Sequence, residues 1–263
     1  MNKLTKVGCS ALCGSLAAIS AANAGDLSVT GGAHVTYMSN STANTGNPFG
    51  MASAVTFAGS GELDNGWGWN FVIDETDTVA FSAARVNITM GGLGTIEFDQ
   101  GNSGNGIAAY DNVLPTAWEE AHGAGLSGGV KTVLGAGASD NIQYSSPVIA
   151  PGMIGAEFAI TYAKDYGSAD TADKTNSATE DVYDEAKDIT FKVNPSLGTE
   201  ILSGLNLYLG ASTIENEHGS AQEEDQYQGV GAVTYALGPV EVGAMWSGIY
   251  DGNDITSTAY HSY

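Results

Sequence analysis

Residues 154–162 read IGAEFAITY, and this short stretch decides the fold class. Apolar residues occupy its even positions, whereas the polar residues Glu157 and Thr161 occupy odd positions. Successive side chains of a β-strand point to opposite faces of a sheet, so a period of two predicts a strand with one apolar and one polar face.

The same alternation recurs on both sides of this stretch, for example in WGWNFVID (67–74), DNIQYS (140–145) and VEVGAMWS (240–247). It predicts about twelve strands. Two of them, MASAVTFAGS (51–60) and VAFSAARVNITM (79–90), are placed by their position between turns as much as by pattern. The tenth, YQGVGAVTYAL (227–237), has the least regular pattern of all.

Half-buried strands suit either a soluble sandwich or barrel with the apolar face inside, or a membrane barrel with that face outside. Aromatic residues gather near strand ends, and short connections alternate with long polar ones, as in membrane barrels. The polar face also carries ionisable residues that a dry core would not accept. We therefore predict a transmembrane antiparallel β-barrel. Its outward apolar band is predicted to include Leu27, Val29, Phe71, Ile96, Phe158, Ile160, Phe191, Leu207 and Val242.

The opposite parity assigns a set of charged residues to the interior of the barrel. The predicted pore-lining residues are Asp74, Glu97, Asp99, Glu157, Asp188, Lys192 and Glu241. Arg85, the only arginine in the chain, shares the polar face of its strand with Asn87 and Thr89. Acidic residues outnumber basic ones in this set, so the interior is predicted to favour cations.

The N-terminal 24 residues have the pattern of a cleavable signal peptide. Lys3 and Lys6 precede a short apolar run, and Ala22-Asn23-Ala24 has the form of a cleavage site, so residues 25–263 would form the barrel. Cleavage would remove both cysteines and leave 6 basic against 30 acidic residues, a formal charge of −24. This acidity argues against a nucleic-acid partner.

One segment departs from the alternation: IAAYDNVLPTAWEEAHGAG, residues 107–125. It carries the carboxylates Asp111, Glu119 and Glu120. Thr116 and Glu119 form a capping-box pattern after Pro115, which predicts a short helix over 117–122. By itself the segment suits a solvated surface loop as well as an insert within a channel.

Three stretches resemble the Gram-negative general porins, and those of alphaproteobacteria more than enteric ones. They are RVNITMGGLGTIEFDQGNSGNG (85–106), AAYDNVLP (108–115) and SDNIQYSSPVIAPGMIGAEFAITYA (139–163). The resemblance covers most of the chain after residue 24 and is closest from Arg85 to Ala163. It implies a 16-stranded barrel that forms a homotrimer in the outer membrane, in contact with lipid and lipopolysaccharide.

In that family the third loop folds into the barrel and narrows the pore. The resemblance therefore implies that residues 100–139 form a constriction loop, with Asp111, Glu119 and Glu120 near the narrowest point and Arg85 across from them. Such porins usually carry several arginines opposite the loop, so a single arginine implies a weak positive side. About twelve strands, and a final TSTAYHSY (256–263) that alternates poorly, favour a C-terminally truncated sequence over a genuine smaller barrel.

The leading functional hypothesis is a porin through which small hydrophilic solutes and cations diffuse passively. The alternative is a surface binding protein or adhesin that acts through its long acidic loops. An outer-membrane hydrolase is disfavoured because no nucleophile–base motif is recognisable. No cofactor is expected. The acidic stretches 170–185 and 215–226 could hold Ca²⁺ or Mg²⁺ loosely, although a solvated acidic surface is the simpler interpretation.

Overall fold

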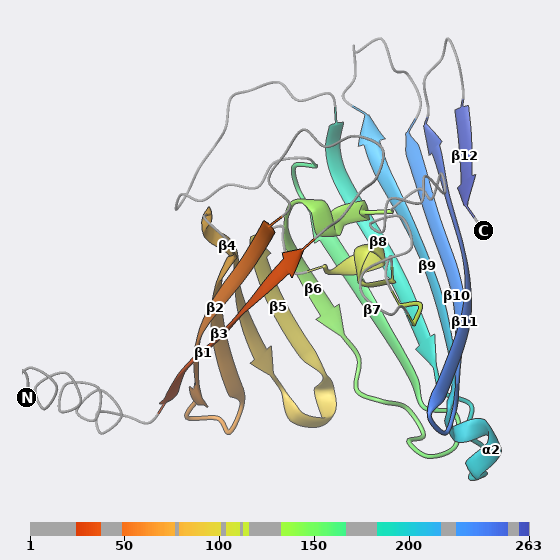
Figure 1. Ribbon diagram of the computed structural model, residues 1–263, viewed down its shortest axis with the longest axis horizontal. Helices are drawn as coiled ribbons and strands as arrows, with labels where there is room; N and C mark the ends of the chain where they lie inside the picture. The colour runs from red at the N-terminus through yellow and green to blue at the C-terminus, as the bar shows by residue number, and fades with distance from the viewer. Residues whose placement is uncertain are drawn as a thin grey trace, which may run out of the picture. The chain divides into compact units, whose positions relative to one another are not determined.

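The computed structural model describes nine ranges of the chain: 25–37, 49–76, 79–100, 104–110, 113–115, 133–166, 183–216, 225–251 and 258–262. The predicted signal peptide lies outside them. The chain divides into two compact units, Met1–Met90 and Gly91–Tyr263, and each is a run of antiparallel strands (Figure 1). None of the helices in the described ranges has the length and apolar character needed to cross a membrane.

The described part of the first unit forms four strands: β1 (Gly25–Tyr37), β2 (Phe49–Glu62), β3 (Gly68–Thr76) and β4 (Val79–Thr89). Each strand pairs antiparallel with the next one along the chain. The predicted tight turn between β2 and β3 is present. Gly66 adopts φ 81° there, and Asn65 Oδ1 accepts a hydrogen bond from the Trp67 N–H at 3.1 Å.

The described residues of the second unit form eight strands, again antiparallel and in chain order. The strands are β5 (Thr95–Gln100), β6 (Asp140–Ser145), β7 (Ala156–Ala163), β8 (Tyr183–Val193), β9 (Leu205–Asn216), β10 (Gln226–Leu237), β11 (Val240–Asp251) and β12 (Thr258–Ser262). The described parts of its connections include the short 3₁₀ helices η1 (Gly91–Leu93), η2 (Gly106–Tyr110) and η3 (Gly135–Ala138) and the α-helix α2 (Glu200–Ser203).

The predicted all-β class and the twelve predicted strands are confirmed within the described ranges. The strands with weak patterns are present too, since β2, β4 and β10 cover the three stretches that the alternation defined least well. The alternation did not predict α2, which lies in the connection between β8 and β9.

In the second unit the two faces of the strands differ as the alternation predicted. Ile160 and Val242, from the predicted outward band, are each 50% exposed, whereas residues of opposite parity such as Thr161, Thr190 and Ser247 are buried. On β1 of the first unit Val29 is 56% exposed, and its neighbours Ser28 and Thr30 are exposed as well. A sheet with an exposed apolar face and a covered polar face is inverted relative to a soluble barrel, and this is the arrangement that lipid requires.

Candidate functional site: the β5–β6 connection against the polar face

The covered polar face of the second unit lies beneath the connection between β5 and β6, residues 101–139. The described parts of this connection include η2 and η3, which contact each other and lie against β7, β8 and β9 (Figure 1). These two 3₁₀ helices therefore pack on the polar face of the sheet, where a pore insert would lie.

Asp188, on β8, is the central contact between the sheet and this connection. Its Oδ2 accepts a hydrogen bond from the Ile107 N–H at 2.9 Å. The Ala136 N–H donates to both carboxylate oxygens, at 3.0 and 3.1 Å. One carboxylate thus binds backbone of both η2 and η3, and it is only 2% exposed. Charge-assisted bonds of this kind are among the stronger hydrogen bonds in proteins.

Two glutamines hold the connection in a similar way. Gln228 Oε1, on β10, accepts the N–H groups of Leu134 and Gly135 at 3.0 and 3.1 Å. Gln143 Oε1, on β6, accepts the Gly106 N–H at 2.8 Å. We call Asp188, Gln228 and Gln143 the anchor residues, because their side-chain oxygens satisfy backbone N–H groups that the connection would otherwise bury without partners.

Asparagines complete this polar network near the ends of the connection. Asn105 Nδ2 donates to Asn141 Oδ1 at 3.1 Å. Asn141 Nδ2 in turn donates to Asp99 Oδ2 at 3.2 Å and to the Ser139 carbonyl at 2.8 Å. These bonds tie both ends of the connection to the strands from which it leaves.

Glycine allows the backbone to approach Asp188 this closely. Gly106 and Gly135 have φ values of +61° and +50°, in the left-handed region that favours glycine. A Cβ atom at Gly106 would lie 2.0 Å from Asp188 Oδ2, and one at Gly135 would lie 2.4 Å from the same atom. Gly106 at the end of GNSGNG and Gly135 at the start of GAGASD are thus explained by contact with a carboxylate on the sheet.

Apolar contacts add to the hydrogen bonds. Ile107 and Val133 are fully buried and cluster with Val230 of β10, and Tyr110 and Met245 pack against this cluster. Ile107 sits over Gly210, where an added Cβ would lie 2.8 Å from Ile107 Cγ2. A second cluster joins Ala136 of η3 to small or branched side chains of the strands, Ala163, Ala186 and Ile214.

Tyr110 closes the end of η2 and packs edge-on against Tyr208 of β9, with ring centroids 5.1 Å apart. Burial raises the pKa of the Tyr110 phenol above its ordinary value, an effect only partly offset by hydrogen bonding to Thr190. The phenol therefore remains a neutral hydrogen-bonding group at physiological pH.

The predicted pore-lining residues fall into distinct environments. Asp99 and Asp188 are buried within the network just described. Glu97 is half-buried on β5, and Glu241 is exposed on β11. Glu157 and Lys192 are half-buried and lie opposite each other on β7 and β8.

Asp74 and Arg85 belong to the first unit, where they form an ion pair of 3.6 Å. Asp74 also accepts a hydrogen bond from Thr56 Oγ1 at 2.5 Å. The predicted constriction carboxylates Asp111, Glu119 and Glu120 lie outside the described residues, as does the predicted helix over 117–122. The placement of Arg85 opposite the loop thus stays a prediction.

Sequence reasoning did not single out Gln228, Gln143 and Asn141, because uncharged polar residues are common on the wet face of any barrel strand. A usable signal was nevertheless present. Two glycine-rich stretches flank the segment that departs from the alternation, and glycine permits close contact between a backbone and another element.

Within the described residues, no group of three or more His, Cys, Asp or Glu side chains could hold a metal ion. The acidic stretches proposed for Ca²⁺ or Mg²⁺ lie largely outside them.

Comparison with known proteins agrees with this arrangement. No curated protein matches the chain. The family model for Gram-negative porins matches residues 8–263, which is nearly the whole sequence. Porins are channel proteins and not enzymes. An exposed apolar sheet face, a polar face covered by a loop, and a match of this extent lead to one conclusion: the chain belongs to the Gram-negative porin family.

Proposed function

We propose that the chain forms a water-filled channel across the outer membrane, through which small hydrophilic solutes and ions diffuse passively, with a preference for cations. The observation that carries this proposal is the anchoring of the β5–β6 connection on the polar face of the sheet. Asp188 alone accepts bonds from residues 81 and 52 positions away in sequence. A loop that binds a partner outside the cell does not require such anchoring on the polar face of the sheet.

We further propose that residues 100–139 narrow the channel. The support for this is that the backbone of η2 and η3, one on each side of the predicted constriction residues, lies on the sheet. Asp111, Glu119 and Glu120 would then line the narrowest point, with Arg85 opposite. The ion pair with Asp74 leaves Arg85 a weaker positive field than a free guanidinium would have.

The proposed cation preference rests on the carboxylates that remain in contact with solvent. Asp99 and Asp188 are buried, and Asp74 is paired with Arg85. Glu97 and Glu157 are half-buried and Glu241 is exposed, and Lys192 lies on the same face. Fixed charges of one sign inside a narrow wet pore favour ions of the opposite sign.

By family membership we also propose a homotrimer, surrounded by outer-membrane lipid and lipopolysaccharide. We further propose that residues 1–24 direct export of the chain and are then removed by cleavage. A sixteen-stranded barrel belongs to the same proposal.

Conductance in planar lipid bilayers tests the channel. The folded chain should insert in discrete steps, each adding a constant current in potassium chloride. If the protein inserts into the bilayer and no steps appear, the channel is refuted and the adhesin hypothesis takes its place. Glu200→Gln, a change on the exposed helix α2, is a matched control because it should leave the step size unaltered.

A further inference from the structure

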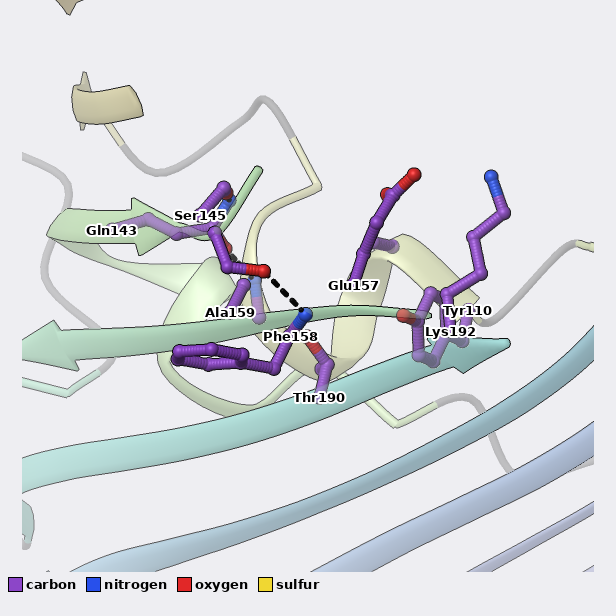
Figure 2. Close-up of a pocket in the computed structure, with 11 residues that line it drawn as sticks. Tyr110, Gln143, Ser145, Glu157, Phe158, Ala159, Thr190 and Lys192 are labelled. Atoms are coloured by element: carbon purple, nitrogen blue, oxygen red, sulfur yellow. Dashed lines mark hydrogen bonds between the residues drawn. The ribbon is translucent and has the colours of Figure 1, made fainter. Parts of the chain in front are cut away.

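A recess of about 170 Å³ lies between η2 and the sheet of the second unit (Figure 2). Gly106, Ala109 and Tyr110 line it from the loop side. Its polar lining from β6, β7 and β8 consists of Gln143, Ser145, Glu157, Thr190 and Lys192. A space of this size admits a solute with a handful of non-hydrogen atoms together with water.

Glu157 and Lys192 give the recess one charge of each sign. They are direct register partners on β7 and β8, so their Cβ atoms are close neighbours on one face of the sheet. Figure 2 shows both side chains extending in the same direction from neighbouring strands. Within the described residues, neither head group takes part in an ion pair or a side-chain hydrogen bond.

Other opposite charges of this protein do meet. Arg85 reaches Asp74 at 3.6 Å, and Lys187 reaches Glu185 and Glu215 at 2.8 and 2.7 Å. The Glu157–Lys192 pair differs from these because the two residues are register partners whose carboxylate and ammonium groups form no ion pair in the described part of the chain. Both groups are therefore available to a third molecule that carries complementary charges.

The remaining lining supplies neutral hydrogen-bonding groups. Thr190 and Ser145 contribute hydroxyl groups, and Tyr110 contributes a phenol that its packing on Tyr208 holds in place. The position of Tyr110 depends on η2, whose first N–H is held by the anchor residue Gln143 at 2.8 Å. The recess is thus a product of the anchored loop.

We propose that Glu157 and Lys192 form a binding site for small zwitterionic solutes of the amino-acid class, on the path through the proposed channel. The carboxylate of Glu157 binds the ammonium group of the solute, and the ammonium group of Lys192 binds its carboxylate. A simple cation is attracted by Glu157 but repelled by Lys192, and a simple anion is attracted by Lys192 but repelled by Glu157. The pair therefore favours solutes that carry both charges. This inference rests on the proposed channel for its physiological meaning.

The test compares glycine with its uncharged isomer glycolamide, which has the same atoms and nearly the same size. In planar bilayers, glycine added to both sides should lower the open-channel conductance more than glycolamide at equal concentration. The excess should become clearly smaller in Glu157→Gln and in Lys192→Met, because loss of one partly exposed charge should weaken glycine binding about threefold to fivefold. The double variant Glu157→Lys/Lys192→Glu should keep the excess, since a reversed pair still offers both charges.

Glu200→Gln makes the same change in net charge as Glu157→Gln, but outside the recess, and should keep the full glycine effect. Equal effects of the two isomers on the unmodified protein would overturn the proposal, as would an undiminished glycine effect in both single variants. A protein that gives no channels refutes the proposed function alone. Binding is then decided by saturation-transfer NMR on lipid nanodiscs. Glycine must receive magnetisation from the unmodified protein and clearly less from both single variants, or the site is refuted.

Discussion

At the scale of single residues, Asp188 shows that a residue on the polar face of a strand need not line the pore. Alternation places it on the polar face, which suggests a charge in contact with permeating ions. It is instead buried, and its oxygens bind the backbone at Ile107 and Ala136. Its carboxylate therefore binds the loop backbone, and the loop separates it from ions in the proposed channel.

We predict that Asp188→Asn loosens the loop without changing ion preference much. The amide keeps one acceptor oxygen but turns an N–H₂ group toward the backbone donors, and hydrogen bonds to charged groups contribute about 1.5–3 kcal/mol each. Single-channel recordings should show larger current fluctuations, while the reversal potential in a salt gradient should shift little. Asp64→Asn, the same change in an exposed turn, should alter neither quantity. Quiet channels with a large shift in reversal potential would show that Asp188 acts as a pore charge.

Gly106 gives a second prediction at this scale. Gly106→Ala places a methyl group 2.0 Å from Asp188 Oδ2 and forces an L residue to adopt φ +61°, so η2 must move away from the sheet. Hydrogen exchange at the Ile107 amide should become faster by at least an order of magnitude. Gly92→Ala is the control, because a Cβ there meets nothing within 4 Å. Unchanged protection of Ile107 in Gly106→Ala would contradict the described contact.

At the scale of elements, the strands could be predicted from sequence and the loop contacts could not. Strand faces follow from a local period of two, so Ile160 and Thr161 could be assigned to opposite faces from their order alone. The contacts of the loop are not local. Leu134 and Gln228 are 94 residues apart, and nothing near either residue specifies the other. The glycines were visible in the sequence, but the carboxylate that requires them was not.

The two faces of β9 allow the orientation itself to be tested. Leu209 is 62% exposed on the apolar face, whereas Asn206 points to the opposite face and accepts a hydrogen bond from Asn194 Nδ2 at 3.3 Å. Lysine on the lipid face of a barrel costs about 2–4 kcal/mol near the bilayer centre. Leu209→Lys should therefore lower the free energy of unfolding in lipid vesicles by about that amount, as measured by denaturant titration of tryptophan fluorescence. Asn206→Lys should cost clearly less, and an equal cost would refute the assignment of faces.

At the scale of the whole molecule, net charge and its distribution determine what the proposed channel passes. The complete sequence carries a formal charge of −22, and much of it lies in the stretches 170–185 and 215–226. Acidic loops raise the local concentration of cations and lower that of anions around them. Because this effect acts through solvent, it weakens as salt shortens the screening length to about 10 Å at 0.1 M.

The final prediction is that the reversal potential across a potassium chloride gradient has the sign of cation preference, and that the preference falls as the mean salt concentration rises. A chelator should be present, because divalent ions bound to carboxylates would mask the fixed charge.

The position of the charge can be tested with a double variant. If Glu119 and Glu120 line the constriction, replacing both by Gln removes charge from the narrowest part of the pore, where the low-dielectric wall confines the electric field. The cation preference should then drop measurably. The same change at Glu223 and Glu224 removes equal charge from a solvated stretch and should have a smaller effect. A zero or anion-directed potential in the unmodified protein would refute cation preference, and equal effects of the two double variants would remove Glu119 and Glu120 from the constriction.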